Sequence, residues 1–190
     1  MKKIKLDEFT TLFKVKNVPI RFHWSLFVFV VAIVVASLIN GDFPIVVFAL
    51  LFVLIAHELG HMWFASHLGL KSSHIDLYPM GGVCYHQEAY SEYEEGIVAW
   101  GGVAVQVMIA TPALLISYFY GDSLSTYLEE LLYYLGYYNL LIVAINLIPI
   151  APLDGSKCWK TIPLYMKYGS MKKRDKRRED ALKKYDRWRK

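Results

Sequence analysis

The feature that most constrains this sequence is the segment His57-Glu58-Leu59-Gly60-His61, which stands near the end of a long apolar run. The run begins at Pro44 and contains no charged residue before Glu58. On a helix, residues four apart lie about 40° from each other around the axis, so the two histidines project from one face with the glutamate beside them. Ionisable side chains at membrane depth are costly and usually serve a function. The segment therefore predicts a functional site on an apolar helix.

This spacing is the two-histidine zinc motif with its glutamate. Zinc binds neutral imidazole nitrogens, and a catalytic zinc keeps one coordination position for water. A carboxylate next to that position is placed to take a proton from the water. We therefore expect His57 and His61 to be ligands of Zn²⁺ and Glu58 to be the catalytic base.

A zinc site of this kind needs a third protein ligand, and His67 is one candidate. It follows His57 by ten residues, the spacing of the soluble metzincins, but those proteins have a glycine where this sequence has Phe64. If the helix continues, His67 lies about 240° around the axis from His61 and faces elsewhere. We expect it to be an interfacial histidine at the helix end.

Asp154 is the acid that the sequence favours as third ligand, because it follows the fourth apolar run within a segment interrupted by Pro149 and Pro152. Non-helical backbone at membrane depth is tolerated only where it is buried in protein or faces a wet cavity. Antiparallel packing of two spans that end on the same side would bring Asp154 to the histidines. The alternative is a Pro-Leu-Asp-Gly turn that caps the helix at the membrane surface. The acids of the loop before the third span, such as Glu88, are expected to be solvated.

The composition predicts a polytopic membrane protein, because 55% of the 190 residues are hydrophobic and the mean hydropathy is +0.30. Of 21 Lys and Arg residues, six lie at or before Arg21, fourteen lie at or after Lys157, and Lys71 alone lies between them. These bands follow the positive-inside rule and argue against a nucleic-acid partner, which needs basic residues spread over one folded face. Both termini are therefore expected in the cytoplasm. The two cysteines have no CxxC spacing and are expected to be free.

We predict an all-α polytopic membrane protein with about four transmembrane helices and a small β-hairpin between the second and the third. The spans are expected near residues 24–39, 44–67, 96–120 and 127–148. The first is a little short for a hydrocarbon core of about 30 Å. The expected organisation is a cytoplasmic N-terminal segment without an evident cleavable signal, a transmembrane core, and a basic cytoplasmic tail, at residues 1–23, 24–156 and 157–190.

The expected hairpin lies within residues 75–85, where β-type residues flank the pair Gly81-Gly82. Its exposed edge could accept an extended peptide. A simple turn explains the same residues about equally well.

The basic tail carries one apolar helical stripe, which suits an anionic membrane surface. The stripe consists of Ala181, Leu182, Tyr185 and Trp188. A solvated tail that only sets the topology is the favoured interpretation.

Three segments together resemble the site-2 proteases, the intramembrane zinc metalloproteases. They are His57-Glu58-Leu59-Gly60-His61, Asn146-Leu147-Ile148-Pro149 and Pro152-Leu153-Asp154-Gly155. Residues 19–25 and 78–83 are also similar to family features, so the resemblance extends over residues 19–157. One departure is the third span at Gly101-Gly102-Val103-Ala104-Val105-Gln106, where many relatives have a Gly-Pro pair and a downstream Asn.

The resemblance implies a role for each of these residues. It implies that His57, His61 and Asp154 bind zinc and that Glu58 activates water. It also implies that Asn146 and Pro149 help to hold the substrate, and that the region of Gly81 and Gly82 is a β-element that engages the substrate strand.

The predicted function is hydrolysis of a peptide bond in or near a transmembrane segment of another protein, in the lipid bilayer of a prokaryotic cell membrane. His57 lies thirteen residues beyond Pro44, about 20 Å by helical rise, so the metal is expected inside the bilayer nearer its cytoplasmic face. One alternative is a transporter or channel in which the same His, Glu and Asp side chains carry ions or protons. Another is a non-proteolytic scaffold with structural zinc, which Glu58 disfavours. The sequence leaves the oligomeric state open.

Overall fold

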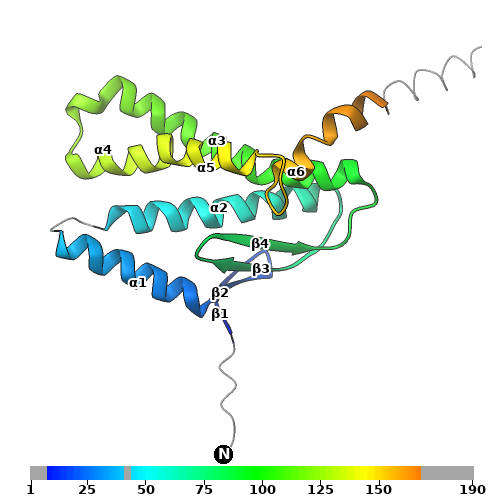
Figure 1. Ribbon diagram of the computed structural model, residues 1–190, viewed down its shortest axis with the longest axis horizontal. Coiled ribbons are helices and arrows are strands. Elements are labelled where there is room, and N and C mark those ends of the chain that lie inside the picture. The colour runs from blue at the N-terminus through cyan, green and yellow to red at the C-terminus, as the bar shows by residue number, and fades with distance from the viewer. Residues whose placement is uncertain (1–7, 41–43, 168–190) are drawn as a thin grey trace, which may run out of the picture.

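The computed structural model describes residues 8–40 and 44–167. The N-terminal elements are β1 (Phe9–Val15), β2 (Val18–His23), α1 (Trp24–Ile39) and α2 (Ile45–His67). There follow β3 (Ser72–Tyr78), β4 (Gly81–His86), α3 (Glu92–Tyr120) and the 3-10 turn η1 (Gly121–Ser123). The last elements are α4 (Thr126–Tyr133), the π-helical turn η2 (Tyr134–Tyr138), α5 (Asn139–Asn146) and α6 (Gly155–Cys158). Helix α2 lies at the centre, with α3 and α5 along one side and the sheet and α1 along the other (Figure 1).

Three helices of the described chain are long and apolar enough to cross a membrane, namely residues 45–67, 92–120 and 126–146. Helix α1 is also apolar but has 16 residues. Helix α3 begins four residues before the predicted span at residue 96, because Ser91 caps it by accepting a hydrogen bond from the backbone N–H of Glu94. Acidic residues in its first turn also favour a helix start there.

The sheet is larger than the lone hairpin expected in an otherwise all-α protein. Its four strands lie in the order β1-β2-β3-β4. Strands β1 and β2 pair antiparallel around Lys16 and Asn17, which both have positive φ, as two-residue hairpin turns require. Strand β2 then pairs in parallel with β3. Residues 9–23, expected as a segment preceding the core, therefore supply half of the sheet.

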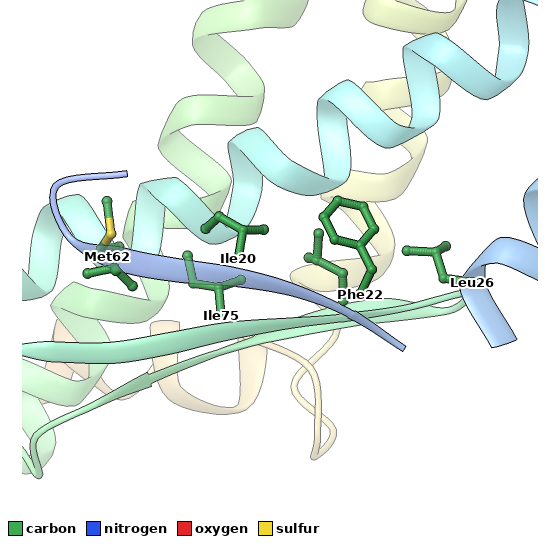
Figure 2. Close-up of a cluster of buried hydrophobic side chains, with 7 residues drawn as sticks. Ile20, Phe22, Leu26, Met62 and Ile75 are labelled. Carbon is green, nitrogen blue, oxygen red and sulfur yellow. The ribbon is translucent and has the colours of Figure 1, made fainter. Parts of the chain in front are cut away.

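The sheet is fastened to α2 by a buried apolar cluster (Figure 2). Side chains alternate along a strand, so β2 turns every second residue toward α2. The cluster consists of Val18, Ile20, Phe22, Leu26, Met62, Ile75 and Leu77. Burying one side chain of this size contributes about 1.5–3 kcal/mol, so these contacts hold the sheet firmly against the C-terminal half of α2.

The backbones of helices α2 and α3 come into close contact at a pair of glycines, Gly60 and Gly101. A Cβ atom added to Gly60 would lie 2.8 Å from the backbone carbonyl carbon of Gly101. A Cβ atom added to Gly101 would lie 2.9 Å from the carbonyl carbon of Gly60. Only residues without a side chain allow this backbone contact, which brings α3 against the histidine motif.

The chain beyond residue 156 stays in contact with α3 as far as it is described. The indole N–H of Trp100 lies 3.1 Å from both the carbonyl oxygen of Cys158 and the Oγ1 atom of Thr161. Lys157 pairs with Glu95 at 2.9 Å. The apolar stripe predicted at Ala181, Leu182, Tyr185 and Trp188 lies outside the described residues.

The face of the sheet turned away from α2 holds an ion pair between the two parallel strands. Arg21 and Asp76 are register partners on β2 and β3. The Nε and Nη2 atoms of Arg21 donate to the two carboxylate oxygens at 2.6 and 2.7 Å. Asp76 is only 3% exposed, and Arg21 is the cation in direct contact with its buried charge, while Nε2 of His74 lies farther away at 3.8 Å.

We expect Arg21→Met to lower the free energy of unfolding by about 3 kcal/mol, because it leaves the Asp76 carboxylate buried without its cation. Thermal unfolding in detergent, followed by circular dichroism, measures this effect. Lys14→Met, on the exposed strand β1, is the matched control. Arg21→Met combined with Asp76→Asn should recover part of the loss. Equal unfolding temperatures for Arg21→Met and the control would contradict the assignment.

Candidate metal centre

The two histidines of the motif lie on the face of α2 that is packed against α3. Both are 8% exposed. Gly102 of α3 makes room for their rings, because a Cβ atom there would lie 2.5 Å from Cε1 of His57 and 2.6 Å from Nε2 of His61. The two Nε2 atoms lie 3.0 Å apart. Adjacent turns of one helix thus direct two ligand atoms to one point.

Asp154 joins the histidines from a distant part of the chain. Its Oδ2 atom lies 3.1 Å from Nε2 of His57 and 3.5 Å from Nε2 of His61. Asp154 occupies the position before α6, but its side chain makes no capping hydrogen bond. Gly155 allows the chain to turn tightly here, because a Cβ atom would collide with the backbone of Leu147 and Ile148. The carboxylate therefore faces the histidines and does not cap the helix.

The three side chains fit a zinc ion. Ligand atoms about 2.0–2.1 Å from a tetrahedral zinc lie about 3.3 Å from one another, close to the distances between these three atoms. His61 Nδ1 donates to the carbonyl oxygen of Val98 at 2.9 Å, and His57 Nδ1 donates to Oε1 of Gln106 at 2.9 Å. Each neutral ring then presents the lone pair of Nε2 to the other ring and to the carboxylate. Three electron-pair donors that converge in this way are suited to hold a cation between them.

Glu58 lies beside this group and between α2 and the sheet. Its side chain is packed against Gly82 of β4, where an added Cβ atom would lie 2.7 Å from the Oε1 atom of Glu58. Glu58 is 3% exposed and does not belong to the group of three potential ligands in the described chain. The arrangement leaves this carboxylate available for proton transfer.

A cavity of about 810 Å³ opens onto the four motif side chains. This volume is within the range of sites that enclose a ligand. Gly81, Gly82 and Asn146 line it, and apolar residues of α1 and α2 form much of its wall. Pro149 is exposed and is absent from the described lining, which contains Pro152 instead. The position of Pro149 therefore gives no support to the substrate contact predicted for it.

Other candidate ligands lie apart from the metal group. His67 Nδ1 donates to the carbonyl oxygen of Trp63 at 2.8 Å, at the exposed end of α2. Cys84 and Cys158 are free, as expected. Burial raises the pKa of each thiol to about 12, so both stay protonated at neutral pH and are poor metal ligands.

Sequence reasoning missed the residues that surround the histidines. Gln106 stood out only as a departure from a family pattern, and Asn139 was not singled out. Both are buried amides within apolar helices, and such isolated polar residues are the signal that could have found them. The carbonyl oxygen of Val98 has no sequence signal, because every residue has one.

Comparison of the sequence with models of known protein families identifies the family of this chain. The sequence model of peptidase family M50 matches residues 45–126 and 111–178. The chain belongs to peptidase family M50. Membership agrees with the apolar helices in indicating a membrane protein.

One curated protein is similar to this chain in sequence, and one solved structure is similar to it in fold. A zinc metalloprotease of Methanocaldococcus jannaschii is 37% identical over 163 residues, which cover 85% of this chain and 47% of that protein. The chain thus spans about half the length of this curated relative. The site-2 protease from Methanocaldococcus jannaschii superposes with a TM-score of 0.67 at 30% identity, over 84% of this chain and 73% of that one. The predicted resemblance to site-2 proteases is confirmed, and family and relative together imply zinc as the metal.

We expect Gly102→Ala to weaken zinc binding at least about 10-fold, because the new methyl group displaces the rings of both histidines. Competition with a chromogenic chelator measures the affinity. Gly121→Ala is the control, since no atom lies within 4 Å of the added Cβ atom there. Unchanged affinity in Gly102→Ala would show that the histidines do not bind the metal in this arrangement.

Proposed function

We propose that this chain is the catalytic core of an intramembrane zinc metalloprotease, which hydrolyses a peptide bond in or near a transmembrane segment of another protein. The observation that carries the proposal is the convergence of His57, His61 and Asp154 beside a buried Glu58. The cavity at this point gives a peptide access to the group. Family membership supports peptide hydrolysis as the reaction.

The roles of the site residues follow from their chemistry. His57, His61 and Asp154 would hold the zinc ion, which would supply a Lewis acid for the scissile carbonyl group and for the attacking water. Glu58 takes a proton from the attacking water and delivers it to the leaving amine. Among the described residues that line the cavity, Lys157 is the only Lys or Arg, and it pairs with Glu95 at 2.9 Å.

The substrate must present an extended backbone, because a helix hides its carbonyl groups in internal hydrogen bonds. Strand β4 is the last strand of the sheet, and five of its residues line the cavity, namely Gly81, Gly82, Val83, Cys84 and His86. We assign to this edge the pairing with the substrate strand. Asn146, across the cavity, offers an amide to the same strand. Pro149 contributes by ending α5 ahead of the loop that carries Asp154.

The proposed topology has four crossings, with α1 as the first. Its 16 residues extend about 24 Å, so flanking residues complete the span. Both basic termini are then cytoplasmic, and the metal lies nearer the cytoplasmic face. The archaeal relatives support a prokaryotic cell membrane as the location.

Glu58→Gln tests the proton-transfer role. We expect the variant to keep its zinc and to lose cleavage by at least about 100-fold, because an amide cannot accept the proton. The assay is cleavage of a single-span substrate protein in proteoliposomes, with the zinc content measured in parallel. Glu94→Gln, an acid outside the cavity lining, is the control. Equal cleavage by Glu58→Gln and wild type would exclude Glu58 as the base.

Asp154→Ala tests the third ligand. Loss of a direct ligand should weaken zinc binding by more than about 100-fold, since even outer contacts are worth about 10- to 100-fold. Glu88→Ala, which removes an exposed acid, should bind zinc like the wild type. If Asp154→Ala keeps the wild-type affinity, the carboxylate has only a structural role.

A further inference from the structure

We propose that Gln106 is a positioning residue of the metal centre, whose side-chain oxygen fixes the ring of His57 so that Nε2 faces the metal. The contact is direct, at 2.9 Å between Gln106 Oε1 and His57 Nδ1. This inference rests on the proposed function for the identity of the metal and adds a residue outside its ligand and proton-transfer set.

The two histidine ligands are held by different kinds of acceptor. Nδ1 of His61 donates to a backbone carbonyl, that of Val98, which no substitution removes. Nδ1 of His57 donates to a side chain. When a histidine loses its Nδ1 acceptor, the ring can rotate or move its proton to Nε2, and Nε2 then no longer offers a lone pair. Of the two Nδ1 acceptors, only the side chain of Gln106 can therefore be removed by a substitution.

Gln106 is itself held in place on α3. It is 1% exposed and lies one helical turn beyond Gly102, the residue that allows α3 to contact the histidine rings. Its backbone carbonyl oxygen accepts a hydrogen bond from Nδ2 of Asn139 at 2.9 Å. Asn139 is fully buried. A polar contact buried between two apolar helices has no water to replace it, so it restrains both helices.

The π-helical turn η2 explains how Asn139 reaches α3. The backbone N–H of Asn139 bonds to the carbonyl oxygens of Tyr134 and Gly136 and bypasses Leu135. The side-chain amide of Asn139 donates to Leu135 at 3.2 Å as well as to Gln106. Such turns occur frequently at functional sites. A continuous path of contacts therefore runs from the last span through Asn139 and Gln106 to His57.

The test replaces the acceptor without changing the size of the side chain. Gln106→Met removes it, and Gln106→Glu restores an acceptor at the same place. We measure the zinc dissociation constant by chelator competition and the visible absorption spectrum of the Co²⁺-loaded full chain in detergent. Gln106→Met should bind zinc about 10- to 100-fold more weakly, with an altered Co²⁺ spectrum, and Gln106→Glu should bind as tightly as wild type.

Gln87→Met is the matched control, because the side-chain oxygen of Gln87 accepts its hydrogen bond from the backbone N–H of Lys71 and Gln87 is not among the residues that line the cavity. If Gln106→Met matches this control in affinity and spectrum, the positioning role is wrong while the proposed function stands. If both Gln106 variants lose zinc and unfold at lower temperature, Gln106 serves packing and the proposal is again overturned. A wild-type chain that binds no zinc would overturn the proposed function itself.

Discussion

The structure depends on bringing three ligand atoms from α2 and the residue before α6 to one point inside an apolar protein. His57 and His61 come from adjacent helical turns, but Asp154 is almost a hundred residues away in the chain. The close contact of Gly60 with Gly101 and the open space at Gly102 let α3 lie against the histidine rings. Converging electron-pair donors repel one another without a cation, so this packing and metal binding support each other.

The sheet is packed against α2 and contacts the side chain of Glu58 through Gly82. Its apolar face is packed on α2 through residues such as Ile20, Ile75 and Met62 (Figure 2). That docking places Gly82 directly against the side chain of Glu58. The edge of β4 and the buried carboxylate are thereby held next to each other, as the proposed cleavage of an extended peptide beside a general base would require.

Most polar groups next to the histidines are hydrogen-bonded, although the Oδ1 atom of Asn139 has no hydrogen-bond partner among the described residues. Val98, Gln106 and Asn139 form a shell of hydrogen bonds around and behind the histidines. Water is scarce in such surroundings, so an unpaired polar group is costly and its partners are correspondingly well defined. The shell gives the ligands a fixed orientation before the metal binds, because each Nδ1 atom has one acceptor.

Local patterns in the sequence were sufficient to predict the three long apolar helices and to single out the two-histidine motif and Asp154 as candidates, because each is a feature of one segment. The alternation of Val18, Ile20 and Phe22 is also typical of a strand, but it is short and lies in a segment with basic residues. The parallel pairing of β2 with β3 was decided only by the fold, since it joins segments separated by two helices. The contact of Gln106 with His57 likewise depends on how closely α2 and α3 are packed. Short-range periodicity determines which face of an element is apolar, whereas only tertiary packing determines which polar atom meets which.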